Sequence, residues 1–204
     1  MSTDNDVISA ARILDAGRTQ VRRFGENKTN VVDIARSLNT SHSTIYRHFR
    51  SKADVFDAIV EEIMRAEESL AETYVKGKQP ASARLRELTL ALHRRKVDQF
   101  NNDQEVYQLY RRVVDERQDI VQNHTVIMTQ LIAAILASGV DNGEFKMDDI
   151  DGAAVVVRDA VLVFVHPAHV AAAAKAGVSR EADLHRMMTT LMTAFRHGVS
   201  LQDV

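Results

Sequence analysis

The scarcity of helix-breaking residues is the feature that most constrains this fold. The 204 residues contain two prolines, Pro80 and Pro167, and eight glycines. Proline ends or kinks a helix and glycine weakens one, so their rarity permits long helices. Aromatic residues make up 5% of the chain, and no hairpin dipeptide lies between alternating apolar runs. The sequence therefore predicts an all-α protein.

Apolar periodicity between the breaks predicts the individual helices. Gly25 ends the first helix, and the segments 76–80 and 139–143 separate later ones. Residues 168–176, which are rich in alanine, could form a short helix or a loop. The expected helices cover residues 6–24, 31–38, 42–49, 52–75, 81–101, 104–114, 117–138, 148–165 and 179–200.

Composition excludes several classes of site. The chain has no cysteine, which rules out disulfides, zinc–thiolate sites and thiol catalysis and is compatible with a reducing cytoplasm. Residues 1–6 are polar and acidic, unlike a signal peptide. No uninterrupted apolar run approaches the ~18 residues of a membrane span. We expect a cytoplasmic protein with no membrane partner.

Charge is distributed unevenly along the chain. Residues 1–52 carry nine Lys/Arg and five Asp/Glu, whereas the remainder carries 17 and 23. A basic end on an acidic body fits a nucleic-acid partner at that end, although chance variation along a neutral chain gives the same numbers.

Two short helices and a tight turn are expected within residues 29–52. Asn39 tolerates the left-handed conformation of such a turn. Thr29 or Asn30 can cap the helix before it, and Ser41 the helix after it. Two short helices joined in this way are the helix-turn-helix arrangement. Apolar positions that can close a small core with the first helix are Val31, Ile34, Ala35, Leu38, Ile45 and Phe49.

The outward face of the second short helix contains donors, rings and a cation. Ile45 and Phe49 lie four residues apart and point inward. No acidic residue lies on the opposite face, as expected for a helix placed among phosphates. That face is formed by His42, Ser43, Thr44, Tyr46, Arg47 and His48.

This segment resembles the tetracycline-repressor (TetR) family over about residues 10–60. The shared pattern comprises Ile13, Leu14, Ala16, Gly25, Thr29, the string 33–35 (Asp-Ile-Ala), Ser41, the stretch 44–49 (Thr-Ile-Tyr-Arg-His-Phe), Ser51 and Lys52. The chain departs from the family at Asn39, where glycine is usual, and at Thr40, where an apolar residue is usual.

The resemblance implies a DNA-binding role for these positions. Thr29 and Lys52 resemble residues that hold phosphates at helix ends, and a helix N-terminus would assist Lys52. Tyr46 and His48 resemble backbone contacts, whereas Arg47 can address guanine O6 and N7 together. The full expected DNA-binding set is Thr29, Ser41, His42, Ser43, Thr44, Tyr46, Arg47, His48 and Lys52.

For the C-terminal part the resemblance implies architecture only: a helical domain with a ligand cavity and a dimer interface in the last two long helices. The run 153–165 is apolar nearly all round, and the last helix carries a broad apolar stripe. These residues could instead form an intrachain core. The expected interface residues are Val157, Val161, Leu184, Met188, Leu191 and Phe195.

A pocket lining can be proposed from aromatic, methionine and isolated polar residues. Arg158 interrupts an apolar run and needs a partner, either an acid or an anionic ligand. His166 and His169 are a weak metal signal, and no catalytic motif is present, so we expect no cofactor, no metal and no enzyme activity. The expected lining is Phe100, Tyr107, Tyr110, Arg111, His124, Met128, Arg158 and Phe164.

These features predict a DNA-binding domain over residues 1–52, joined through the long helix 52–75 to an effector-binding and dimerisation domain over 53–204. The expected function is a homodimeric transcriptional repressor that binds an inverted-repeat operator in double-stranded DNA and is released by a small-molecule effector. Two alternatives remain: a helical ligand-binding or enzyme domain with purely structural N-terminal helices, and a constitutive or activating regulator without an effector.

Overall fold

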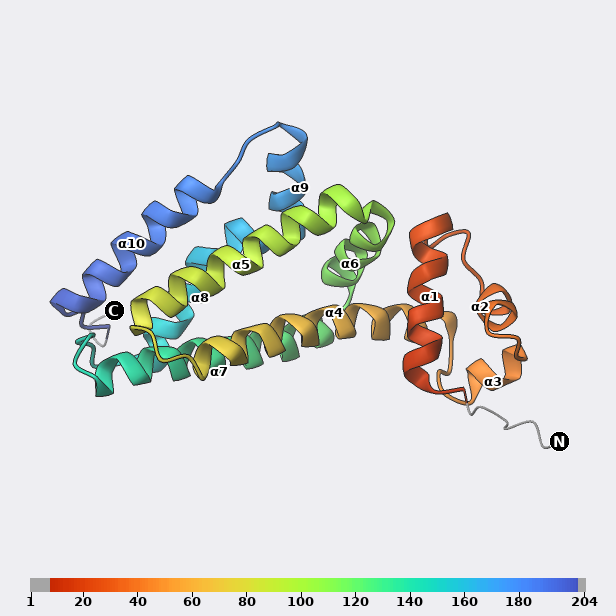
Figure 1. The fold of residues 1–204 in the computed structure, drawn as a ribbon, viewed down its shortest axis with the longest axis horizontal. Coiled ribbons are helices and arrows are strands. Elements are labelled where there is room, and N and C mark those ends of the chain that lie inside the picture. The colour runs from red at the N-terminus through yellow and green to blue at the C-terminus, as the bar shows by residue number, and fades with distance from the viewer. Residues whose placement is uncertain (1–7, 202–204) are drawn as a thin grey trace. The chain divides into compact units, whose positions relative to one another are not determined.

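A computed structural model describes residues 8–201, and these residues form ten helices and no strand (Figure 1). An isolated bridge joins Met147 to Val199. The predicted all-α class is confirmed. The helices form two compact units: unit 1 contains the described part of Met1–Ile63 together with Asp103–Glu116, and unit 2 contains Met64–Asn102 and the described part of Arg117–Val204. The expected boundary after residue 52 lies inside unit 1.

Unit 1 is built on α1 (Ala10–Phe24), α2 (Val31–Ser37), α3 (His42–Tyr46), the first part of α4 (Lys52–Val75) and α6 (Gln104–Glu116). Helix α1 packs against α2 and α6, and α2 packs against α3. The buried side chains that join them are Ile13, Val21, Ile34, Ala35, Ile45, Val55, Phe56, Ile59, Val106 and Leu109.

The start of the first helix differs from the prediction. The expected start at Asp6 lies outside the described residues. In the described part α1 begins at Ala10, because the Ser9 side chain accepts a hydrogen bond from the Arg12 N–H and caps the helix. At the other end Phe24 is 46% exposed, with the Arg23 guanidinium 5.1 Å from its ring centre.

Unit 2 contains the rest of α4 with α5 (Ala81–Asn102), α7 (Gln118–Asp141), α8 (Ile150–Val165), α9 (Pro167–Lys175) and α10 (Glu181–His197). Helix α5 contacts α7, α8, α9 and α10, and α7 packs along α8 (Figure 1). The alanine-rich segment is therefore a helix, which settles the choice left open by the sequence. The His166 Nδ1 atom accepts a hydrogen bond from the Ala168 N–H at its start.

Buried charges hold unit 2 together. The guanidinium of Arg84, which is 3% exposed, donates to the carbonyls of Tyr74, Val75 and Gln79 and to the Ser138 hydroxyl. It thereby satisfies carbonyls at the end of α4 that have no partner within the helix. Lys96 forms an ion pair with Glu67, and both side chains are almost fully buried.

The composition of helix α7 departs from the expectation that no segment is long and apolar enough to cross a membrane. Among the described residues it is long and apolar enough to do so by length and composition, and the bent pair α8–α9 also meets this test when taken as one segment. A core helix of a soluble protein meets the same test, and α7 packs against α5 and α8 in unit 2.

Candidate functional site

The turn before α3 sets the position of that helix. Asn39 has a φ of 51°, the left-handed conformation expected for it. The Thr40 N–H donates to the Ala35 carbonyl at 3.0 Å. The Ser41 side chain then accepts from the Thr44 N–H at 3.2 Å and caps α3. Ser41, which was expected to contact DNA, therefore has a capping role here.

Helix α3 separates its buried and exposed residues sharply. Ile45 is completely buried and anchors the helix in the core of unit 1. Tyr46 is 48% exposed, its ring lies edge-on to that of His42, and Arg47 and His48 are exposed beside it. Within the part of the chain that the structure describes, the side chains of Arg47 and His48 have no hydrogen-bond or ion-pair partner. The predicted DNA-binding residues His42, Ser43, Tyr46, Arg47 and His48 are all exposed, and Thr44 is half-buried.

Thr29 differs from this group. Its side chain is 1% exposed, and its hydroxyl donates to the Gly25 carbonyl at 2.8 Å. Its N–H is also directed at the carbonyls of Gly25 and Glu26. The predicted phosphate contact of this side chain is therefore not supported, because the hydroxyl is already used inside the loop. Thr29 holds the loop before α2 in shape.

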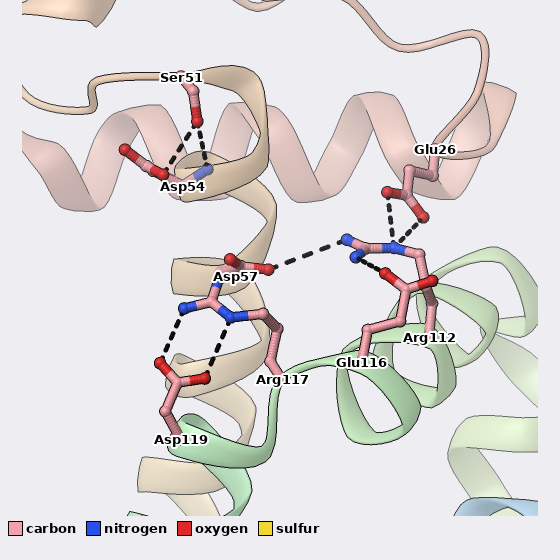
Figure 2. Close-up of polar contacts among 8 residues, drawn as sticks. All are labelled: Glu26, Ser51, Asp54, Asp57, Arg112, Glu116, Arg117 and Asp119. Atoms are coloured by element: carbon pink, nitrogen blue, oxygen red, sulfur yellow. Dashed lines mark hydrogen bonds and ion pairs between the residues drawn. The ribbon is translucent and has the colours of Figure 1, made fainter.

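The start of α4 combines a cation with an internal anion. The Lys52 ammonium lies 5.2 Å from the ring centre of Phe56. The Ser51 hydroxyl accepts from the Asp54 N–H at 3.1 Å and donates to the Asp54 carboxylate at 2.9 Å (Figure 2). The same carboxylate accepts from the Arg50 N–H. Ser51 therefore caps α4, and Asp54 occupies part of the helix end that was expected to help Lys52 bind a phosphate.

Helix α6 is joined to the helix-turn-helix by ion pairs that the sequence did not reveal. Figure 2 shows Arg112 of α6 between Glu26, in the loop before α2, and Asp57 of α4. Its Nε atom lies 2.9 Å from the Glu26 carboxylate, and its Nη2 atom lies 3.9 Å from Asp57. Burial opposes the charge on Arg112, but its hydrogen bonds to Glu26 and Glu116 outweigh that effect and raise its pKa.

A second pair joins α1 to the start of α6. The Arg22 guanidinium donates to Asp103 at 2.6 and 3.1 Å, and this bond raises the pKa of Arg22. Residues 26 and 112 are 86 positions apart, and no local pattern connects them. A single sequence without homologues gives no signal from which these pairs could have been found.

The predicted pocket residues do not form one site within either unit. Tyr107, Tyr110 and Arg111 belong to α6 in unit 1, where both tyrosines are buried and Arg111 lies 3.8 Å from Asp115. In unit 2, Phe100, Met128 and Phe164 are buried. His124 is hydrogen-bonded to Glu68 at 2.7 Å, and the half-buried Arg158 pairs with the neighbouring Asp159 at 2.7 Å.

One cavity of unit 2 includes a predicted pocket residue, Phe164. It has a volume of about 240 Å³ and is bounded by α5, α8, α9 and the segment that leads into α10. His93 and Arg180 line it but were not predicted to do so. No local pattern in the sequence marks either residue, because His93 lies in a long amphipathic helix and Arg180 in an interhelical segment.

The predicted dimer residues require a correction. Their exposed fractions are 5% or less for five of the six, which belong to the hydrophobic core of a single protomer. Side chains buried in this way cannot also contact a partner subunit, so the alternative of an intrachain core holds for these five residues. They are Val157, Val161, Leu184, Met188 and Phe195. Leu191 is half-buried. Helix α8 instead exposes Val155, Val156, Leu162 and Val163, each between 38% and 49%.

The histidines of α9 do not add a metal site. The rings of His166 and His169 have centroids 5.5 Å apart. Over residues 8–201, no group of three or more His, Cys, Asp or Glu side chains could hold a metal ion.

Comparisons with solved structures show the fold. FadR from Bacillus subtilis, in complex with stearoyl-CoA, is 17% identical with a TM-score of 0.60, over 94% of this chain and 100% of that one. SmeT, the repressor of the Stenotrophomonas maltophilia multidrug efflux pump SmeDEF, is 17% identical with a TM-score of 0.66, over 92% and 90%. A transcriptional regulator from Cytophaga hutchinsonii is 13% identical with a TM-score of 0.68, over 90% and 96%.

Comparisons with family models cover both units. No curated protein sequence matches the chain. Residues 13–59 match the model of bacterial regulatory proteins of the tetR family, and residues 81–185 match the tetracyclin repressor-like C-terminal domain. The first match contains the capped helix-turn-helix, and the second contains most of unit 2. The chain therefore belongs to the TetR family of transcriptional regulators.

Proposed function

We propose that this protein is a ligand-responsive repressor that binds an inverted-repeat operator as a homodimer and is released by a small-molecule effector. The observation that carries the proposal is the exposed, acid-free face of α3 and of the turn that follows it, where Arg47 and His48 have no partner among the described residues. Unpaired donors on a helix anchored by a buried Ile45 are suited to bind the edges of bases and phosphates.

The proposed contacts follow the placement of each side chain. Arg47 reads guanine, and His42 and Ser43 contact neighbouring base edges in the major groove. Tyr46 and His48 contact the phosphate backbone, with Thr44 beside them. Lys52 adds a charge at the start of α4. Thr29 contributes by holding the loop before α2 through its hydroxyl, and not by contacting DNA with that side chain.

The proposed dimer uses the outward apolar row of α8. Val155, Val156, Leu162 and Val163 present apolar surface to solvent within nine residues of one helix. Large apolar side chains exposed on one helix of a soluble protein indicate an interaction site, and the exposed Asp159 lies between the two pairs. Leu191 of α10 is the one originally predicted interface residue that is still available to join it.

The proposed effector acts on unit 2. A protein of the same fold is in complex with stearoyl-CoA, which supports a small-molecule ligand for this chain. Helix α6 lies between α5 and α7 in the sequence and is ion-paired to Glu26 and Asp57. A ligand that moves the ends of α5 or α7 would therefore act on the loop before α2. The size of that shift is limited by the difference in ligand affinity between the two states.

The test is DNase I footprinting on the fragment upstream of the protein's own gene. A twofold dimer places its two α3 helices in successive major grooves, about 34–36 Å apart, so we expect two protected half-sites related by an inverted repeat. Transcription from the same fragment should fall when protein is added, and an activator would increase it. Absence of a footprint, or a footprint without twofold symmetry, would contradict the proposal.

A further inference from the structure

The cavity of about 240 Å³ in unit 2 has mostly apolar walls. Val97 of α5, Phe164 of α8, and Val170 and Ala173 of α9 form much of its lining. Ligand sites for drug-sized molecules range from about 300 to 1,000 Å³. This cavity therefore suits a small ligand with an apolar body.

A buried histidine gives the cavity a polar group of defined orientation. His93 is 4% exposed, and its Nδ1 atom lies 2.8 Å from the Phe164 carbonyl oxygen. Because a carbonyl can only accept, Nδ1 must carry the proton of that bond. In the neutral ring Nε2 is then unprotonated and carries a lone pair that can accept a hydrogen bond. No group in residues 8–201 is hydrogen-bonded to it. It can accept from a ligand hydroxyl or, once protonated, donate to a carboxylate.

The charged residues that line the cavity are one arginine, Arg180, and one glutamate, Glu181. Arg94 holds the Glu181 carboxylate with two hydrogen bonds of 2.9 and 2.7 Å, which lower the pKa of that carboxyl. Asp183 is shared by Arg180 and Arg186. Both carboxylates are already paired with guanidinium groups, so neither is free to receive a cationic ligand.

Arg180 is the arginine that lines the cavity. Its guanidinium lies 5.0 Å from the ring centre of Phe164, on the cavity wall. Its Nε atom donates to Asp183 at 2.8 Å. The two terminal nitrogens have no partner among the described residues and present the paired donors that a carboxylate accepts.

We propose that this cavity binds a small carboxylate with an aromatic or branched apolar body, and that Arg180 holds its carboxylate. Phe164 and the α9 residues enclose the body, and His93 contributes the buried polar contact. The identification of this ligand as the effector rests on the proposed function; the binding site itself does not.

Calorimetric titration of the full chain with benzoate, phenylacetate and 3-methylbutanoate tests the site. We expect at least one of the three acids to bind. The amide of each acid that binds should bind at least about tenfold more weakly, because it lacks the charge that pairs with the guanidinium. Failure of all three acids to bind, or equal affinity for acid and amide, would overturn the assignment.

Two arginines that share Asp183 provide a matched pair of variants. Arg180→Gln should weaken the binding of the acid at least about tenfold. Arg186→Gln, whose side chain does not line the cavity, should leave it unchanged. Ala173→Leu, which fills the cavity, should also abolish binding while the circular dichroism spectrum and melting temperature stay near the wild-type values. Equal affinity of both arginine variants would contradict the role of Arg180.

Measuring DNA affinity in the presence of the acid shows whether the binding site or the effector role has failed. If the acid binds through Arg180 but does not change affinity for the footprinted fragment, the site stands and the effector role fails. If another molecule releases the DNA from both wild type and Arg180→Gln, and no acid binds, the repressor stands and this site fails.

Discussion

The face of α3 and the interior of unit 2 use charged side chains in opposite ways. Directly after α3, Arg47 and His48 are exposed and unpaired within the described part of the chain. In unit 2, Arg84 and Lys96 are nearly inaccessible and bonded to several acceptors or to a carboxylate. Exposed charges contribute little to folding, whereas a buried charge must be paired. The comparison distinguishes exposed charged side chains that are available to bind a partner from buried charged side chains that stabilise the fold.

Breaking the buried pair should have the largest effect. Lys96→Met leaves the Glu67 carboxylate buried without its cation, so we expect a loss of about 3–5 kcal/mol in the free energy of unfolding. The double variant Lys96→Met/Glu67→Leu removes both charges and should recover most of that loss. Urea denaturation measures both values. A single variant as stable as wild type would contradict the structural role of the pair.

The exposed apolar side chains of α8 extend the comparison from charged to apolar residues on the surface. Leu162→Glu should convert the dimer to monomers, because it places an unpaired charge in the proposed interface. Val126→Glu on α7 is the matched control, since both residues are 49% exposed. Light scattering after gel filtration gives the mass of each variant. If both variants remain dimers, the interface lies elsewhere.

Arg111 and Arg112 of α6 allow a paired and a surface arginine to be compared within one helix. Arg112 is hydrogen-bonded to Glu26 and Glu116, whereas Arg111 lies 3.8 Å from Asp115 on the helix surface. We expect Arg112→Met to lower the free energy of unfolding by about 1–2 kcal/mol and Arg111→Met to change it by less than about 0.5 kcal/mol. Thermal denaturation of both variants tests this. Equal losses would remove α6 from the proposed coupling route.

The smallest effect that we expect is the pH-dependent contribution of Glu144 to the free energy of unfolding. Burial alone would raise the pKa of Glu144, but hydrogen bonds from Ser82 and Arg196 lower it below its usual value. The stabilisation is therefore present above the ordinary glutamate pKa and disappears as pH falls through the lowered value. Glu144→Gln should be less stable than wild type by under about 1 kcal/mol at pH 7. The difference should disappear as the pH falls through the lowered pKa of Glu144, and a difference that grew in acid would contradict this account.

The parts of unit 1 that could be predicted are those with local causes. The cap at Ser41, the left-handed Asn39 and the cap at Ser51 each depend on residues within a few positions. The exposure of Arg47 follows from the burial of Ile45 on the same short helix. Thr29 was misjudged because its hydroxyl is used by Gly25, a contact that the family pattern does not reveal.

Unit 2 could be predicted as helices but not as a site. An apolar stripe such as that of α10 does not say whether it meets its own core or a second copy, and Leu184 and Met188 proved to be core. The pairing of Arg94 with Glu181 joins residues 87 positions apart. Such contacts depend on how helices pack, and periodicity carries no information about them.

The salt dependence of DNA binding tests the central claim most directly. The measurement is the affinity of wild type, Arg47→Ala and Arg186→Ala for the footprinted fragment, by fluorescence anisotropy between 50 and 300 mM salt. Log affinity of the wild type should fall steeply with log salt, by about 0.9 for each phosphate neutralised. Arg47→Ala should bind at least about tenfold more weakly at every salt concentration, with an unchanged melting temperature, and Arg186→Ala should match wild type. A flat salt response, or equal affinity of all three proteins, would contradict α3 as the DNA-binding surface.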